Sequence, residues 1–205
     1  MCKQANMMHH TEAPELNPKI RRQAISFSQY SVHIDSEIGN PTEYRDMIAM
    51  LFAAEEGDDI TIYLNSPGGQ LDTTLAIIEG IKHTQAHVRG VILGACHSAA
   101  SMLSMYVDEL VILDSAHSMI HTASFGCAGA TNNIKSQTDF TVKQVEKFLN
   151  ETYTGFLSAK ELTQVKLGVE LWFDAEELRT RMLSRVAYLT KLSKANAKKL
   201  LKKDE

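Results

Sequence analysis

Residues 91–105 run VILGACHSAASMLSM, and this stretch decides how the chain folds. Its first three residues are an apolar, β-favouring run, Gly94 interrupts the run, and small residues and methionines follow at helical spacing. The pattern predicts a buried strand, a tight turn and a buried helix that begins near Ser98. The N–H groups of a helix's first turn lack helical partners, so an oxyanion beside Ser98 would be stabilised. By itself the stretch leaves two interpretations of Ser98 open, a nucleophile or a plain helix cap.

The composition is that of one domain with a sizeable core. The chain has 205 residues, 44% of them hydrophobic, and a net charge of −4, which gives no general reason to expect nucleic-acid binding. Three widely spaced cysteines, Cys2, Cys96 and Cys127, suggest a reducing compartment rather than a disulfide framework. Neither a signal peptide nor an apolar run of about 20 residues is evident. We therefore expect a cytoplasmic protein without a membrane partner.

Strands and helices alternate along most of the chain, which predicts an α/β fold with a largely parallel sheet. The predicted helices follow apolar residues at helical spacing or a capping signal. Residues 125–130 are either a loop or a weak edge strand. The predicted strands are 24–27, 30–34, 60–64, 91–93, 111–113, 118–121 and 171–173, and the predicted helices are 40–52, 71–84, 98–105, 139–157, a short helix after the capping box at 158–161, and a last helix from 174.

Charge divides the chain into three parts. Residues 1–19 are a polar arm, residues 20–183 are the main domain, and residues 184–205 are a basic helical tail. The tail holds seven basic and two acidic residues, which leaves 14 basic and 23 acidic residues in positions 1–183. A lysine-rich helix is usually a solvated face, so a docking role for the tail is the less favoured alternative.

Three stretches carry chemistry, and each lies where a strand ends. The turn NSPGG at 65–69 brings backbone N–H groups close to any ligand, because its two glycines allow a sharp bend. The stretch from Gly94 to Ser98 adds a candidate nucleophile and the N–H of Ala99. His121 closes the strand MIH. Sites in open α/β sheets collect at such strand ends, so we expect the three stretches to meet.

Neighbouring reactive side chains are interpreted as bystanders. His97 is adjacent to Ser98, and adjacent residues on a helix diverge by about 100°, so its ring is poorly placed to take the serine proton and is expected to line the pocket. Cys96 is interpreted as a small core residue. His117 and His121 lie four apart on an extended segment without an acidic partner, so we expect no metal site.

The order and spacing of these motifs resemble ClpP, the proteolytic subunit of ATP-dependent Clp proteases, within the crotonase-like superfamily. The resemblance runs from about Ser31 to Leu178. It rests on the strand and turn IYLNSPGG at 62–69, the serine elbow GACHSA at 94–99, MIH at 119–121 and FDAEE at 173–177. The resemblance implies a ClpP/crotonase-like fold of repeated β-turn-α units with a protruding handle helix, here at about 137–153.

The resemblance also implies a serine endopeptidase. Ser98 would be the nucleophile and His121 the general base, with the N–H groups of Gly69 and Ala99 as the oxyanion hole. The family's third triad member is an aspartate, and counting back from Ala175 puts Glu170 at that position. Some triads use glutamate, so Glu170 is expected to orient the imidazole, and Asp174 is the alternative carboxylate.

Substrates and partners follow from the same resemblance. An unfolded polypeptide would bind as an added strand beside Gly68 and the segment Gly126-Cys127-Ala128. The resemblance implies a heptameric ring, with two rings stacked through the handle, fed by an AAA+ unfoldase of the ClpX or ClpA type, and no cofactor on this chain.

The chain departs from the family at both ends, so two other functions remain open. The N-terminal arm is unlike the family's axial loop, and the lysine-rich tail replaces the family's closing motif EYGL[IV]D. One alternative is a non-catalytic or weakly active ring subunit, supported by Glu170 and by a Ser98–His121 interval about two residues short. The other is a crotonase-fold enzyme acting on an acyl-CoA.

Overall fold

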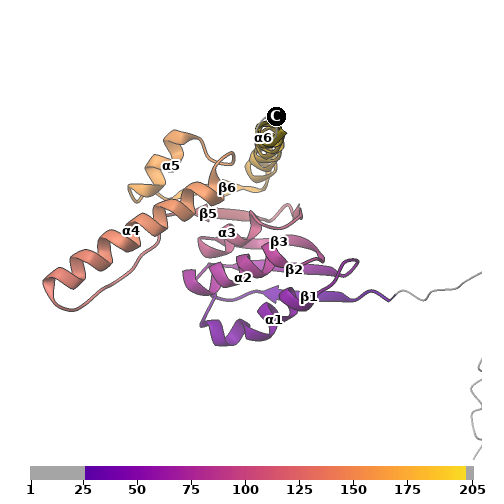
Figure 1. Cartoon of the computed structure of the whole chain (residues 1–205), viewed down its shortest axis with the longest axis horizontal. Helices are drawn as coiled ribbons and strands as arrows, with labels where there is room; N and C mark the ends of the chain where they lie inside the picture. Colours follow the sequence, from indigo (N-terminus) through magenta and orange to yellow (C-terminus); the bar gives the residue numbers. More distant parts are fainter. Residues whose placement is uncertain (1–25, 202–205) are drawn as a thin grey trace, which may run out of the picture.

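Residues 26–201 are described by this computed structural model, with side chains as far as residue 197 (Figure 1). The described strands form one sheet: β1 (Gln29–Ile34), β2 (Asp59–Ser66), β3 (His87–His97), β4 (Glu109–Ile112), β5 (His117–Ile120) and β6 (Leu171–Asp174). The helices are η1 (Pro41–Tyr44), α1 (Arg45–Ala53), α2 (Leu71–His83), α3 (Ala99–Ser104), α4 (Thr131–Tyr153), α5 (Ala159–Lys166) and α6 (Ala175–Leu201).

The sheet is parallel except at one pair of strands. Its order is β1-β2-β3-β5-β6, with β4 beside the first half of β3 and β5 beside the second half. Only β5 and β6, among the described strands, pair antiparallel. The α1 and α2 crossovers lie over one face of the sheet (Figure 1). The predicted α/β class, with its β-turn-α units, is therefore confirmed.

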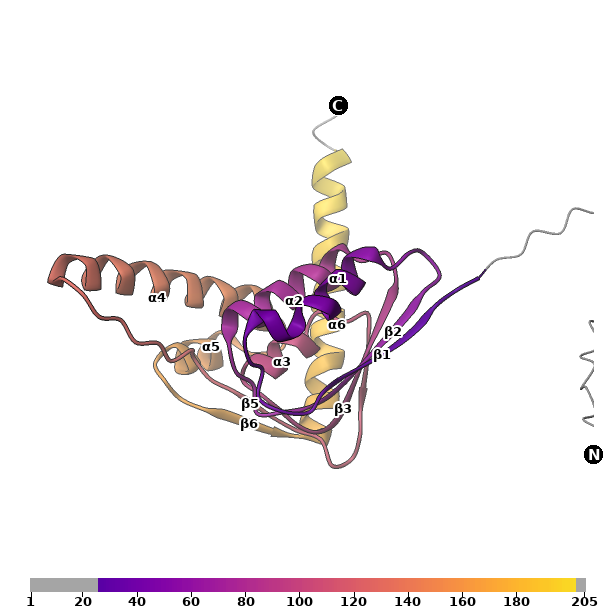
Figure 2. The ribbon, with the colours of Figure 1, turned by 90° about the horizontal axis from the view of Figure 1, so that it is seen from below.

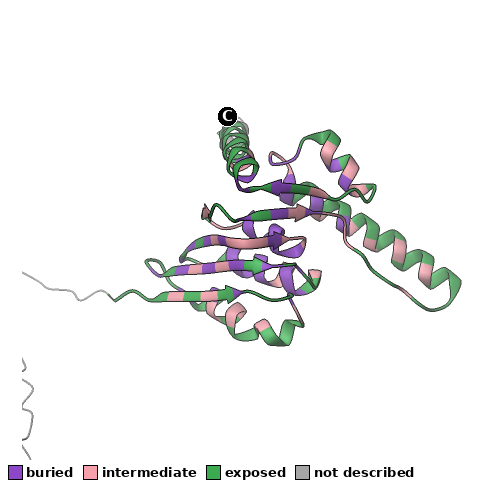
Figure 3. Ribbon diagram, turned by 180° about the vertical axis from the view of Figure 1, so that it is seen from behind, coloured by how far each residue is buried: buried purple, intermediate pink, exposed green. Residues whose placement is uncertain are grey.

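Alternation along the strands decides which face of the sheet is buried. Ile60, Ile62 and Leu64 of β2 are at most 1% exposed, whereas Thr61 and Tyr63 between them are half-buried. Figure 3 looks onto the face opposite α1 and α2, where exposed and partly buried residues alternate with buried ones. The core therefore lies between the sheet and its helices, and it fixes the strands whose ends carry the site.

Gly94 does not end its strand, contrary to the sequence prediction. Strand β3 continues to His97 because the chain bulges: Leu64 pairs with Ile92, but Ser66 pairs with Cys96. The side-chain amide oxygen of Asn65 fills the bulge and accepts the Ala95 N–H at 3.0 Å. A Cβ on Gly94 would lie 2.8 Å from that oxygen, so glycine is needed there for close approach rather than for a turn.

Helix α4 projects from the body, as expected of a handle (Figures 1 and 2). It runs over 131–153 rather than the predicted 139–157. Its buried residues, Val145, Leu149, Thr152 and Tyr153, all lie in its second half, so the projecting first half carries no apolar period that would have marked it as a helix. The helix ends at Thr154, which is extended, before Gly155 with φ +89°.

The two ends of the chain differ from the predictions where they are described. The predicted arm and residues 24–25 of the first predicted strand lie outside the described residues. Phe27 is 61% exposed and belongs to no strand. Helix α6 continues without a break through position 184, where the basic tail was predicted to begin. Arg185, which belongs to the predicted tail, is buried, and its guanidinium donates to the Thr154 carbonyl at 2.9 Å. In the described chain, no helix combines the length and the apolar character that crossing a bilayer requires.

A salt bridge joins α5 to α6 beside β6. The Arg181 guanidinium donates to both carboxylate oxygens of Glu161, at 2.8 and 3.2 Å, and lies 4.5 Å from the centre of the Phe173 ring. The same carboxylate accepts the Ser158 N–H at 2.8 Å, which completes the predicted capping box. These bonds lower the pKa of Glu161 to about 2, with the Arg181 hydrogen bond as the largest cause.

Glu161→Gln should lower the free energy of unfolding at pH 7 by about 1–3 kcal/mol, because it removes a two-point charged contact. The folded-state pKa of Glu161 lies below its ordinary value of 4.5, so its contribution is complete above about pH 5 and disappears as the pH falls toward 2. Urea unfolding at several pH values measures this. Asp114→Asn, which breaks the exposed Arg179–Asp114 pair, should change stability by less than about 1 kcal/mol. A Glu161→Gln effect that is equal at pH 7 and pH 3 would contradict the assignment.

Candidate active site

Ser98 forms the entire turn between β3 and α3. It has φ 51° and ψ −120°, and it is the one non-glycine residue with positive φ in the described chain. Such a conformation is strained for a residue with a Cβ and persists only where its surroundings enforce it. The Ser98 N–H donates to the Met119 carbonyl of β5 at 2.7 Å. The predicted strand–turn–helix is present, with its turn at Ser98 itself.

The side chains of Ser98 and His121 meet. Strand β5 pairs with the end of β3, His97 opposite Met119, so residues one step beyond each strand become neighbours. The Ser98 Oγ lies 2.6 Å from the His121 Nε2. With the imidazole proton on Nδ1, Nε2 accepts the serine hydroxyl proton, which is the geometry of a nucleophile and its base.

Glu170 lies beside His121 in register but is not bonded to it. The last antiparallel pair of β5 and β6 is Ile120 with Leu171, so His121 and Glu170 are the next residues beyond the paired ends of the two strands. Among the residues that the structure describes, no hydrogen bond or ion pair joins the Glu170 and His121 side chains. Asp174, the alternative carboxylate, instead accepts the Glu177 N–H at 2.9 Å at the start of α6.

The glycine turn lies against the serine turn. The Gly68 carbonyl accepts the Ile38 N–H at 2.7 Å, and the Gln70 N–H donates to the Ile38 carbonyl at 2.8 Å. Because successive residues of an extended segment point their N–H groups to opposite sides, the Gly69 N–H faces away from Ile38. The Ala99 N–H is the first of α3, and no helical carbonyl can reach it. Both predicted oxyanion donors are therefore unused by the secondary structure around them.

Gly68 makes this contact sterically possible. It has φ +98°, and a Cβ there would lie 2.7 Å from the His97 carbonyl oxygen and 2.8 Å from the Ser98 Cβ. Its N–H donates to the Ser66 Oγ at 3.1 Å, and its carbonyl is bonded to Ile38. Both backbone groups of Gly68 are thus engaged within the protein, so it serves the site through close packing rather than through a free hydrogen-bonding group.

A cavity of about 400 Å³ opens beside Ser98 and His121. Helix α4 forms one wall of this cavity, and α3 and the glycine turn form others. Its lining combines apolar side chains of α3 and α4 with the polar side chains of Ser98 and His121, as is usual in ligand-binding pockets. The lining residues are Glu37, Gly69, Gln70, Leu71, Ser98, Ala99, Met102, His121, Ala123, Ser124, Val145, Phe148, Leu149 and Tyr153.

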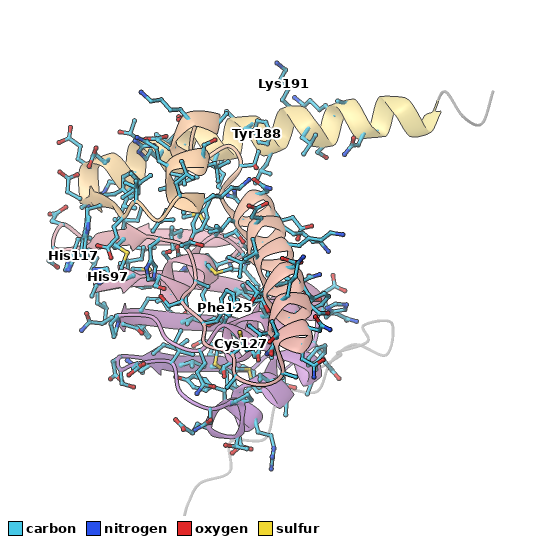
Figure 4. All side chains as sticks on the ribbon, turned by 90° about the vertical axis from the view of Figure 1, so that its left-hand side faces the viewer. His97, His117, Phe125, Cys127, Tyr188 and Lys191 are labelled. Atoms are coloured by element: carbon cyan, nitrogen blue, oxygen red, sulfur yellow. The ribbon has the colours of Figure 1, made fainter. Side chains whose placement is uncertain are left out.

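The predicted substrate-binding segment is a loop between β5 and α4. Gly126 and Ala128 are exposed, and Cys127 is half-buried with its Sγ 3.5 Å from the Thr138 Oγ1 of α4. Figure 4 shows Phe125 and Cys127 on this loop beside α4. Of the two alternatives in the sequence analysis, loop or edge strand, the structure has the loop. Its exposed backbone groups are available to pair with an extended chain.

The other reactive side chains lie off the site. The His97 ring packs 5.0 Å from the His117 ring and 5.1 Å from the Trp172 ring, so it does not line the cavity as expected (Figure 4). Burial lowers the pKa of His97. Burial raises the pKa of the Cys96 thiol to about 12, which keeps it protonated and unreactive at neutral pH. Nowhere in residues 26–201 do three potential metal-ligating side chains gather.

Two polar residues beside Ser98, Tyr153 and Ser101, were not among the site residues that the sequence predicted. Tyr153 lines the cavity, and its hydroxyl lies 2.5 Å from the Ser101 Oγ under the serine turn. The sequence did contain one signal of this link. Tyr153 lies on the apolar face of a predicted helix, and a buried tyrosine hydroxyl needs a hydrogen-bond partner.

Comparisons with known proteins agree with this geometry. A family model described as Clp protease matches residues 21–180. The ATP-dependent Clp protease proteolytic subunit 3 of Streptomyces coelicolor is 30% identical over 137 residues, 64% of this chain and 62% of the relative. The ATP-dependent Clp protease proteolytic subunit of Streptococcus mutans is 27% identical over 139 residues, 63% of this chain and 68% of the relative.

The subunit 2 of Thermobifida fusca is 27% identical over 161 residues, 78% of this chain and 77% of the relative. Shorter matches cover only 62% and 58% of the Streptomyces coelicolor and Leifsonia xyli relatives. The family match spans the sheet, the serine turn, His121 and Glu170 together. The chain belongs to the Clp protease family.

Proposed function

We propose that this protein is a serine endopeptidase of the ClpP type that cleaves unfolded polypeptides. The observation that carries the proposal is the 2.6 Å contact between the Ser98 Oγ and the His121 Nε2 at the mouth of an apolar cavity. A serine hydroxyl is a weak nucleophile until a base accepts its proton, and this contact supplies the base.

The mechanism follows from the positions of the groups. His121 takes the Ser98 proton as Oγ attacks the peptide carbonyl, and the N–H groups of Gly69 and Ala99 hold the oxyanion. His121 then gives the proton to the leaving amine. A water molecule, deprotonated by His121, hydrolyses the acyl-enzyme and restores Ser98. Glu170 is proposed to orient the His121 ring once its carboxylate turns toward Nδ1.

The substrate is proposed to bind in extended form. Its backbone would pair with the loop at Gly126, Cys127 and Ala128, and an apolar side chain before the cleaved bond would enter the cavity. A strand or helix inside a folded domain cannot present such a segment, so we propose that the substrate is unfolded first. The relatives' names include the words ATP-dependent and subunit, and we propose by analogy a ring of this chain served by an AAA+ unfoldase.

The projecting helix α4 supports association with further copies. Phe140 and Val142 on it are 64% and 44% exposed. Residues two apart on a helix face nearly opposite sides, so α4 has apolar side chains available for contact on both sides. We propose that α4 joins copies of this chain, as the family's handle does. A heptameric ring, and a cytoplasmic location, remain predictions from the resemblance.

A weakly active subunit is the second candidate, because Glu170 makes no bond to His121. In that case an active relative or an unfoldase would complete the site. The acyl-CoA alternative is less well supported, because a bonded serine–histidine pair is not what a thioester-binding oxyanion hole requires.

Replacing Ser98 or His121 by alanine should lower the rate of peptide hydrolysis by a factor on the order of 10⁴ or more, since each removes a partner of one chemical step. His117→Ala is the matched control and should retain activity, because His117 lies at the start of β5 and does not line the cavity. Hydrolysis of a fluorogenic peptide, together with fluorophosphonate labelling followed by intact mass, measures both. Full labelling of Ser98→Ala would contradict the assignment of the nucleophile.

Gly68→Ala should abolish most of the activity, because its Cβ would push the glycine turn away from Ser98. Gly168→Ala is the control for backbone strain alone: Gly168 has φ +92°, and nothing lies within 4 Å of a Cβ there. In both variants an alanine must adopt a positive φ, which lowers the free energy of unfolding by about 1 kcal/mol. Thermal unfolding and hydrolysis of the two variants separate strain from displacement. Equal activities would show that the close approach at Gly68 is not needed.

Glu170→Gln should lower kcat by tenfold or more, since an amide cannot stabilise the imidazolium. Asp174→Asn, which changes the alternative carboxylate, should leave kcat within about twofold because Asp174 is bonded at the start of α6. Steady-state kinetics of the two variants decides between these carboxylates. A larger loss in Asp174→Asn would reverse the assignment.

A further inference from the structure

A chain of buried hydroxyl groups runs from α4 to the serine turn. The Tyr153 hydroxyl, at the end of α4, lies 2.5 Å from the Ser101 Oγ. The Ser101 Oγ in turn lies 2.7 Å from the Ser98 carbonyl oxygen. Tyr153 is 1% exposed and Ser101 is fully buried, so water does not compete for these bonds. None of the steps proposed above uses either residue.

The number of hydroxyl protons fixes which group donates in each of these two hydrogen bonds. Ser101 has one hydroxyl proton, and the Ser98 carbonyl can only accept, so that proton is donated to Ser98. The Ser101 Oγ is therefore the acceptor of the Tyr153 proton. Burial raises the pKa of Tyr153, so the phenol keeps its proton at neutral pH. Both donors thus point toward Ser98.

The Ser98 carbonyl belongs to the same peptide group as the Ala99 N–H, the proposed oxyanion donor. A peptide group is planar, so a bond that holds the carbonyl oxygen also aims the N–H on its other side. Hydrogen bonds in a series polarise one another, so donation to this carbonyl makes the N–H a stronger donor. The Ser98 carbonyl also accepts the Met102 N–H of α3, but at the longer distance of 3.3 Å, so the Ser101 hydroxyl makes the shorter of the two bonds that hold this plane.

We propose that Ser101 and Tyr153 are positioning residues of the oxyanion hole, which hold and polarise the Ser98–Ala99 peptide group for the tetrahedral intermediate. This inference rests on the proposed peptidase function. Because Tyr153 is the last residue of α4, it also ties the inner end of that helix to the catalytic serine.

The protein offers a matched control at Thr152, the residue before Tyr153 on α4. The Tyr106 hydroxyl lies 3.0 Å from the Thr152 Oγ1, so it too links a tyrosine to a hydroxyl beside the inner end of α4. Among the described residues, no hydrogen bond joins this pair to Ser98. Tyr106→Phe and Tyr153→Phe therefore remove the same atom from the same kind of bond, and only Tyr153→Phe breaks the series that leads to Ala99.

Kinetics gives the first test, on the full chain with a fluorogenic peptide. Losing one oxyanion donor costs about 10²–10³ in kcat, so weakening one should cost on the order of tenfold. Tyr153→Phe and Ser101→Ala should each show this loss with KM within about twofold of wild type. The double variant should be no slower than Ser101→Ala, because the two hydroxyls act in series. Tyr106→Phe should keep the wild-type kcat.

A merely structural role predicts a different result. If the hydroxyls only satisfy one another in the core, Tyr153→Phe and Tyr106→Phe will lower the unfolding temperature alike and leave kcat unchanged. If Tyr153 acts only as a wall of the cavity, its variant will raise KM alone. Either result would overturn the proposal.

A second measurement does not depend on activity. Labelling serine with ¹³C at the carbonyl and alanine with ¹⁵N selects three peptide groups, those ending in Ala99, Ala116 and Ala159. Both Tyr153→Phe and Ser101→Ala should move the Ser98 carbonyl and Ala99 amide signals, while the other two signals stay. Tyr106→Phe should move none of the three. An unmoved Ser98–Ala99 signal would overturn the proposal. A moved signal in a protein that hydrolyses nothing would uphold the positioning and reject the peptidase function.

Discussion

The left-handed backbone of Ser98 is the constraint on which the rest of the site depends. It reverses the chain in a single residue, so that the strand end and the helix start both present groups to the same point. Three contacts enforce it: the Ser98 N–H bonded to Met119, the Ser98 carbonyl bonded to Ser101, and Gly68 packed against the turn. Each contact comes from a different segment, so the fold as a whole stores the strain that exposes the hydroxyl.

The parallel pairing of β3 and β5 then brings the reactive side chains together. Because β5 continues the sheet beside the end of β3, His121 reaches Ser98 without any long or flexible connection. The antiparallel strand β6 begins one residue after Glu170, and its pairing partner β5 ends one residue before His121. No hydrogen bond joins the Glu170 and His121 side chains in the described chain, so the proposed role of Glu170 rests on its place beside the paired ends of these strands.

Much of this arrangement could be predicted from the sequence, and the exceptions have physical causes. The alternation of Ile60, Ile62 and Leu64 and the motif NSPGG fixed one β-turn-α unit, and Ser98 and His121 followed from their order. Gly94 was misassigned as a strand end because a bulge filled by Asn65 leaves no pattern in a single sequence. The start of α4, residues 131–138, was missed because a projecting helix has no buried face. The Tyr153–Ser101 link joins residues 52 apart, and only the folded chain places them in contact.

We propose that the serine turn and the glycine turn together form one oxyanion site, and a crystal structure of the fluorophosphonate adduct would show whether they do. We expect a single tetrahedral adduct on the Ser98 Oγ, with its phosphoryl oxygen within hydrogen-bond distance of both the Gly69 and Ala99 N–H groups. An adduct on another residue, or a phosphoryl oxygen turned away from both N–H groups, would contradict it.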